Sequence, residues 1–227
     1  DLADGGAMNE GEMATRLGLP GIPNAAESVM ALRDIALCEL TGGTLHIAHV
    51  STAETTEAVR QAKARGVRVT AETAPHYFTL TDEAVVGYNT NAKMNPPLRS
   101  ENDRQAIIAG LADGTIDAIA TDHAPHTWQE KQGPYFEAPS GLPLVQDALP
   151  SLLEHVHRGD LERDRQVLEP LADLRPQQPV LPQQSLLFEL CSFEYGEPVF
   201  VEGIGHLIRL DCRDGRCLGG GNYRHGY

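Results

Sequence analysis

Apolar residues along this chain recur first at a helical spacing and then in short unbroken runs, and the two patterns alternate. Apolar positions at helical intervals predict helices over residues 24–40, 51–66 and 100–114. Short apolar or β-branched runs predict strands over Thr44–Val50, Val67–Glu72 and Thr115–Thr121. The pattern therefore predicts that helices and strands alternate regularly from Asn24 to Ala124.

The predicted helices also carry start and stop signals. Asn24 with Glu27, and Ser51 with Glu54, have the spacing of capping boxes, while Ser100 is placed to cap the third helix. Glycines follow each helix, at Gly42-Gly43, Gly66 and Gly114.

Alternating helices and strands predict an α/β fold with parallel strands and crossover helices. A doubly wound sheet and a (β/α)₈ barrel both fit this pattern. No strand is followed by a G-x-G-x-x-G turn, which disfavours a nucleotide-binding sheet. In a barrel the active site lies at the carboxyl ends of the strands, so the residues that follow each strand are the ones to inspect.

Composition and charge exclude some classes of binding partner. The 227 residues are 41% hydrophobic and 22% charged, which is typical of a globular protein. The net charge of −14 argues against nucleic acid or an anionic membrane as the main partner, but not against a small anionic substrate. No apolar run approaches about eighteen residues and no signal-type segment is present, so we expect a cytoplasmic protein.

Metal-binding residue types follow the three predicted strands. His49 lies at the end of the first, His76 just beyond the second, and Asp122 directly after the third. Histidine and aspartate are ligands of hydrolytic zinc sites, although a single histidine at a strand end is more often an ordinary hydrogen-bonding residue. Four further histidines are interpreted as structural, namely His46 and His123, or as solvated, namely His155 and His157.

Five motifs in order and spacing resemble those of the dihydroorotases, members of the amidohydrolase superfamily. They are "MNEG" from Met8, "HIAHVSTAET" from His46, "ETAPHYFTLTD" from Glu72, "KMNPPLR" from Lys93 and "IATDHAPH" from Ile119. The resemblance covers residues 2 to about 161. It implies a two-zinc (β/α)₈ barrel that interconverts N-carbamoyl-L-aspartate and L-dihydroorotate in pyrimidine biosynthesis.

The resemblance also implies roles for individual residues. His49 and His76 match ligands of one zinc ion, and Asp122 matches both a ligand of the other and the catalytic acid/base. Asn95 and His126 match substrate-binding positions, and Ser140 with Gly141 matches a pair whose backbone contacts the substrate. The intervening loop, "TWQEKQGPYFEAPSG", is either a cover over the site or an inert surface loop.

Other family features are missing. The family places a His-x-His motif after its first barrel strand, whereas here that motif occurs only at His155-Val156-His157. Three βα units are found, while a complete barrel needs roughly 250 residues. We therefore predict a partial barrel over residues 1–161, with incomplete metal binding and no catalytic competence as an isolated chain.

The resemblance stops after Leu161, and residues 162–227 are interpreted as an atypical tail. We predict a Pro/Gln-rich linker at residues 175–185, strands within 186–210 and irregular structure over 211–227. One hypothesis is that the tail is frameshifted or wrongly joined. A coding sequence that proved continuous and expressed across Leu161 would exclude it.

Two alternatives to a dihydroorotase stay open. An allantoinase or hydantoinase would share the metal core and the cyclic amide chemistry, although "KMNPPLR" together with "TDHAPH" favours dihydroorotase. A non-catalytic scaffold subunit beside aspartate transcarbamoylase is the second alternative. Beyond a small-molecule substrate, the expected partners are a second copy of the chain or aspartate transcarbamoylase.

Overall fold

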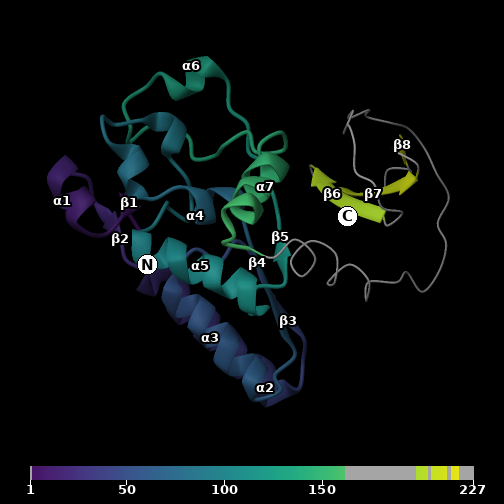
Figure 1. The fold of residues 1–227 in the computed structure, drawn as a ribbon. Helices are drawn as coiled ribbons and strands as arrows, with labels where there is room; N and C mark the ends of the chain where they lie inside the picture. The colour runs from purple at the N-terminus through teal and green to yellow at the C-terminus, as the bar shows by residue number, and fades with distance from the viewer. Residues whose placement is uncertain (1, 162–197, 204–205, 214–215, 220–227) are drawn as a thin grey trace. The chain divides into compact units, whose positions relative to one another are not determined.

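The computed structural model describes residues 2–161, 198–203, 206–213 and 216–219 (Figure 1). The chain divides into two compact units, residues 1–166 and 167–227, and each is described here by itself. The domain boundary placed after Leu161 stays a prediction, because residues 162–197, with the proposed linker, lie outside the described part.

The first unit is built around a three-stranded parallel sheet in the order β3-β4-β5. Its strands are β3 (Leu45–Ile47), β4 (Val69–Thr73) and β5 (Ala118–Ile119). The helices between and before them are α2 (Ala25–Thr41), α3 (Ala53–Ala64) and α5 (Glu101–Asp113). The predicted α/β alternation with parallel strands is confirmed. The strands are shorter than predicted, and β3 ends at Ile47 because His49 adopts a left-handed conformation (φ 40°) that an extended strand excludes.

Smaller elements escaped the sequence pattern. Two-residue strands β1 (Met8–Asn9) and β2 (Gly21–Ile22) form a separate parallel pair. The remaining elements of this unit are α1 (Glu12–Leu17), α4 (Pro75–Thr79), the 3₁₀ turns η1 (Asp82–Val85) and η2 (Thr90–Ala92), α6 (Trp128–Lys131) and α7 (Ala148–Arg158). Apart from α7, which has 11 residues, these segments are too short to show a hydrophobic period.

One of the three predicted helix caps is confirmed and two are wrong. Ser100 forms a reciprocal capping box with Asp103 at the start of α5. The cap of α3 is Thr52, whose hydroxyl accepts from the Thr55 N–H, and not Ser51. Asn24 makes no capping bond with its side chain, which instead donates to Glu54 and Asp103. Both differences arise because tertiary partners compete for these polar groups.

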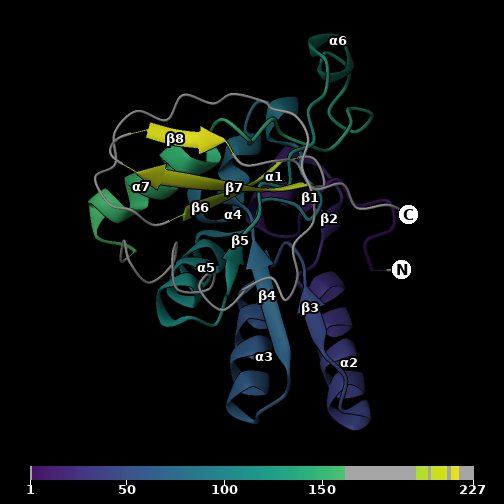
Figure 2. The ribbon, with the colours of Figure 1, turned by 90° about the vertical axis from the view of Figure 1, so that its right-hand side faces the viewer.

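The helices cover one face of the sheet. Figure 2 shows β3 and β4 in front of α2 and α3, with α5 beside them. The fully buried core of this layer includes Val59, Ala62, Ala71 and Ile107. Away from the sheet, α2 exposes several large apolar side chains, namely Val29, Leu32, Leu37 and Leu40.

A tight contact joins α5 to α3 at Gly110. A Cβ atom there would lie 2.8 Å from Cγ2 of Thr56 and 3.1 Å from Cδ1 of Ile116. Both neighbours are buried, so they have little room to move. Gly110 therefore sets how closely the two helices pack.

We expect Gly110→Ala to lower the free energy of unfolding by about 1–2 kcal/mol, because overpacking outweighs the gain in helix propensity. Urea denaturation followed by circular dichroism measures the change. Gly133→Ala is the matched control, since a Cβ at Gly133 meets nothing within 4 Å and should change stability by less than about 0.5 kcal/mol. Equal effects of the two substitutions would contradict the prediction.

The second unit contains an antiparallel sheet in the order β6-β7-β8. Its strands are β6 (Pro198–Gly203), β7 (His206–Arg213) and β8 (Arg216–Gly219). Strands predicted within 186–210 are confirmed where the structure describes them. The irregular structure predicted from residue 211 is wrong for the end of β7 and for β8, which pair with each other. The missed signal is Asp214-Gly215, a dipeptide typical of hairpins.

Among the described residues, none of the helices is long and apolar enough to cross a membrane.

Candidate active site

His76 is the most unusual side chain at the strand ends. It lies at the start of α4, directly after β4, and only 1% of it is exposed. Neither ring nitrogen has a hydrogen-bond partner, although both are buried. Burial, followed by the nearby His49, lowers the pKa of His76 to about 3. The imidazole is therefore neutral near pH 7, with a lone pair available for a ligand.

Asp122 lies next to this histidine. Its Oδ2 is 4.0 Å from Nε2 of His76, and about a third of its side chain is exposed. Burial raises the pKa of the neighbouring Tyr77 well above its usual value, and the charges of Asp122 and Glu27 add to this effect. Asp122 has a φ of 48°, so two of the three predicted zinc ligands, His49 and Asp122, adopt left-handed backbone conformations. Such conformations are uncommon outside glycine and concentrate at functional sites.

His76 and Asp122 have side chains suited to binding a metal ion. The described residues, however, do not assemble a complete set of metal ligands. A buried imidazole without hydrogen-bond partners, with a carboxylate 4.0 Å from its Nε2, matches the donor types of a zinc site. Within the described residues, however, no group of three or more His, Cys, Asp or Glu side chains is arranged to hold a metal ion. His49 is close enough to affect the pKa of His76 but does not complete a three-ligand cluster.

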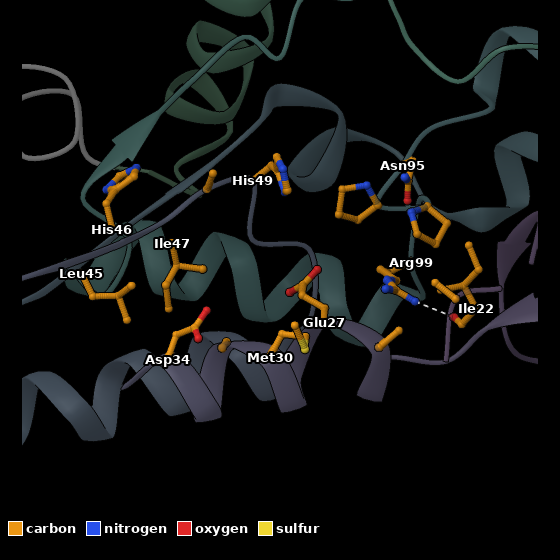
Figure 3. A pocket seen from close by; sticks show the side chains of 16 residues that line it. Ile22, Glu27, Met30, Asp34, Leu45, His46, Ile47, His49, Asn95 and Arg99 are labelled. Carbon is orange, nitrogen blue, oxygen red and sulfur yellow. Dashed lines mark hydrogen bonds between the residues drawn. The ribbon is translucent and has the colours of Figure 1, made fainter. Parts of the chain in front are cut away.

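A cavity of about 350 Å³ lies beside β3 and contains two of the predicted site residues. Figure 3 shows His49 and Asn95 on its wall, with Glu27 and Arg99 below them, nearer to α2. His49 and Asn95 are both exposed, so ligands have access to them.

The other predicted substrate-binding residues form a second group. A ring nitrogen of His126, Nε2, lies 2.9 Å from the Ser140 carbonyl oxygen. Gly141 packs against Ala124, where a Cβ would lie 2.5 Å from the Ala124 carbonyl oxygen, and its φ of 138° also favours glycine. The Gly141 N–H donates to the Lys93 carbonyl (3.0 Å), two residues before Asn95. The structure thus brings His126, Ser140 and Gly141 together and links them through Lys93 to the segment carrying Asn95.

A buried polar network beneath His49 was missed in the sequence. The Glu27 carboxylate accepts from the backbone N–H and the hydroxyl of both Ser51 and Thr52. Arg99, 3% exposed, donates to Ser51 Oγ, to Asn9 Oδ1 and to the Ile22 carbonyl, the last drawn in Figure 3. We interpreted Glu27 as part of a local capping box. The available signal was Arg99 at the end of "KMNPPLR", since a buried arginine needs a carboxylate nearby.

The remaining histidines have structural contacts. His46 lies 2.8 Å from Thr70 Oγ1 and 3.2 Å from Glu72 on the exposed face of the sheet, while His123 Nδ1 accepts from the Leu144 and Val145 N–H groups. The prediction that His155 is solvated is wrong. It is 2% exposed, lies 2.9 Å from Asp160 Oδ2 and packs edge-on against Phe78, because α7 turns this face toward α4. His157, on the same helix, is exposed as predicted.

Comparison with known proteins agrees with the motifs. Residues 1–55 match the family model described as "Dihydro-orotase-like". A curated relative from Desulforapulum autotrophicum, named dihydroorotase, is 60% identical over 162 residues, which are 66% of this chain and 38% of that protein. Another from Pelotomaculum thermopropionicum, with the same name, is 61% identical over 149 residues, or 66% of this chain and 35% of that protein. This chain therefore spans less than half the length of these relatives.

Solved structures give a consistent picture of the fold. D-hydantoinase from Bacillus sp. AR9 matches with a TM-score of 0.60 and 28% identity, over 63% of this chain and 33% of that one. L-hydantoinase (dihydropyrimidinase) from Arthrobacter aurescens matches with a TM-score of 0.59 and 28% identity, over 65% and 34%. The predicted fold class, a partial (β/α)₈ barrel of the metal-dependent hydrolase kind, is confirmed by these likenesses.

Proposed function

We propose that the first unit belongs to the dihydroorotases of the amidohydrolase superfamily and carries part of a zinc-dependent dihydroorotase site, because relatives with that name are about 60% identical to it. The reaction is the interconversion of N-carbamoyl-L-aspartate and L-dihydroorotate in pyrimidine biosynthesis, in the cytoplasm. The observation that carries the proposal is the buried His76, whose ring nitrogens have no hydrogen-bond partner, with the carboxylate of Asp122 at 4.0 Å.

In this proposal His49, His76 and Asp122 supply zinc ligands. The neutral imidazole of His76 is already in the form that binds a metal ion, because burial disfavours its protonated form. When bound, zinc supplies a Lewis acid that polarises the ring amide carbonyl. Asp122 accepts a proton from the attacking water on its carboxylate and passes it to the departing ring nitrogen.

The substrate-binding residues act by orientation. Asn95 presents an amide to the cavity that it shares with His49. In His126, the contact of Nε2 with the Ser140 carbonyl fixes the ring, while Nδ1 lies 3.8 Å from a carboxylate oxygen of Glu130. The backbone of Ser140 and Gly141 contacts the substrate from the far end of the loop. Together these groups would hold a cyclic amide with a carboxylate substituent.

A hydantoinase is the second candidate, favoured by the names of the solved structures with similar folds. We prefer dihydroorotase, because relatives with that name share about twice the identity, 60% against 28%. Homodimerisation and association with aspartate transcarbamoylase remain predictions about partners.

We expect the purified 227-residue chain to bind fewer than two zinc ions and not to turn over L-dihydroorotate, because the described residues contain no complete ligand set. Asp122→Asn should weaken zinc binding by about tenfold, since a carboxamide is a poorer ligand than a carboxylate. Isothermal titration calorimetry measures the number of zinc ions bound and the affinity for zinc.

Asp4→Asn, at an exposed aspartate, is the matched control and should leave zinc binding unchanged. Two zinc ions per chain with dihydroorotate turnover would contradict the predicted incompetence. Zinc binding insensitive to Asp122→Asn would contradict the site, and turnover of hydantoin or allantoin alone would favour the second candidate.

A further inference from the structure

Two buried lysines lie at the loop that carries Ser140 and Gly141. Lys93 is 9% exposed and Lys131 is 7% exposed. Among the described residues, neither ammonium group forms an ion pair with a carboxylate. Buried lysines are rare unless their charge is satisfied, so the contacts that replace a carboxylate indicate their purpose.

Lys93 holds the middle of the loop from outside it. Its ammonium donates to the carbonyl groups of Tyr135 (2.9 Å) and Phe136 (2.8 Å). The same ammonium lies 5.4 Å from the centre of the Tyr135 ring and 5.9 Å from that of Phe136, within the range of cation–π attraction. Two carbonyls and two aromatic faces thus substitute for a counter-ion.

Lys131 lies within the loop and binds the segment outside it. Its ammonium donates to the carbonyl of Thr90 (3.1 Å) on the outside and to that of Pro139 (2.8 Å) within the loop. The Thr90 hydroxyl returns a hydrogen bond to the Lys131 carbonyl (2.5 Å). Pro139 immediately precedes the Ser140-Gly141 pair, so this contact fixes the end of the loop that the substrate would meet.

The loop makes few other long-range polar contacts. Its own backbone bonds are local, such as those from Glu137 and Ala138 to the Pro134 carbonyl. The Gly141 N–H donates to the carbonyl of Lys93 itself (3.0 Å). Both lysines therefore join residues 128–141 to the segment from Thr90 to Asn95, and that segment carries another predicted substrate-binding residue.

We propose that Lys93 and Lys131 are positioning residues that fasten the loop Trp128–Gly141 to the segment Thr90–Asn95 and hold the Ser140-Gly141 backbone against His126. An ammonium group suits this task because it offers three donors, enough to hold two carbonyl oxygens at once. The relevance to substrate binding rests on the proposed function, whereas the fastening itself does not.

The test uses Trp128, which is the single tryptophan of the chain and is 67% exposed in this loop. In Lys93→Met the methylene volume is kept while the charge and the donors are lost. We expect thermolysin to cleave within residues 128–141 at least about tenfold faster than in the unchanged chain, and the fluorescence anisotropy of Trp128 to fall. Lys63→Met is the matched control, because Lys63 pairs with Asp117 and has no contact with the loop.

Hydrogen exchange separates loosening of the loop from a general loss of stability. The amides of Glu137, Ala138 and Gly141 should lose protection in Lys93→Met, while amides within α3 keep theirs. Thr90→Val, which removes one hydrogen bond and keeps both lysines, should give a smaller change in the same direction and serves if Lys93→Met fails to fold. Wild-type cleavage and anisotropy in Lys93→Met and Lys131→Met would overturn the proposal.

An experiment with added ligand tests this proposal separately from the proposed function. With zinc present, N-carbamoyl-L-aspartate should slow cleavage of the loop in the unchanged chain but not in Lys93→Met. If the ligand does not protect the unchanged chain while Lys93→Met is still cleaved fast, the proposed substrate is contradicted. The proposal that the lysines hold the loop then stands. Equal protection of both chains would show that the lysines do not position the substrate-binding backbone.

Discussion

Replacing Glu27 with alanine is expected to lower the free energy of unfolding of the first unit by about 3–5 kcal/mol, because four donors lose their hydrogen bonds to its carboxylate. The Glu27 carboxylate accepts from the Ser51 N–H (3.1 Å), the Thr52 N–H (3.1 Å) and the Thr52 hydroxyl (2.9 Å), as well as from the Ser51 hydroxyl. Ser51 and Thr52 are at most 1% exposed, so water cannot replace these bonds. The two N–H groups and the Ser51 hydroxyl are then left without this acceptor, whereas the Thr52 hydroxyl can still donate to Thr55 Oγ1 (2.8 Å).

Arg99 increases the expected effect. Burial lowers the pKa of this guanidinium, and the charge of Glu27 is the strongest of the influences that oppose the shift. Without Glu27, a guanidinium that is 3% exposed loses its principal stabilising charge. Urea denaturation of Glu27→Ala measures the total loss of stability. Glu27→Gln keeps an acceptor but not the charge, so its stability should fall between those of the unchanged chain and Glu27→Ala.

Glu101→Gln is the control for this experiment. Glu101 is bonded to Arg104 on the surface, so the loss of its charge should cost less than about 1 kcal/mol. Similar losses for Glu27→Ala and Glu101→Gln would show that the network beneath His49 is not a principal source of stability.

The second large effect is expected at His76, and it has the opposite sign. In metal-free protein, His76→Leu should raise the free energy of unfolding by about 1–2 kcal/mol, because two buried ring nitrogens without partners are replaced by an apolar side chain of similar size. The same substitution should weaken zinc binding by about a hundredfold or more, since the ligand itself is lost.

Thermal denaturation with and without zinc measures both changes. The unchanged chain should gain stability on zinc addition, whereas His76→Leu should start higher and gain little. His157→Leu, at an exposed histidine of α7, is the control and should retain the zinc response. A metal-free His76→Leu less stable than the unchanged chain would mean that His76 has a structural partner, which contradicts the interpretation of its nitrogens as metal ligands.

The features that the sequence predicted well are those with a repeating signal. The three long helices and the parallel strands between them follow from hydrophobic period and from glycines at helix ends, and Ser100 caps α5 as predicted. The proximity of His76 to Asp122 follows from strand order, because adjacent parallel strands place their carboxyl ends at the same edge.

Other features depend on contacts far apart in the chain and have no local signal. Glu27 lies three residues after Asn24, as a capping box requires, yet its carboxylate bonds residues 24 and 25 positions away. Arg99 contacts residues 48 to 90 positions away. His155 has the sequence context of a solvated helix end, and only the approach of Phe78 and Asp160 makes it buried. Tertiary partners decided the environment of each of these residues.

The apolar outer face of α2 has a consequence for how the chain behaves in solution. Val29, Leu32, Leu37 and Leu40 are each about half exposed or more, and such faces tend to associate. The net charge of −14 opposes this by mutual repulsion between molecules. Repulsion weakens when salt shortens the screening distance to roughly 3 Å at 1 M, and it vanishes near the isoelectric point of about 5.0. Colloidal stability of this chain is therefore greatest in dilute buffers well above pH 5.0.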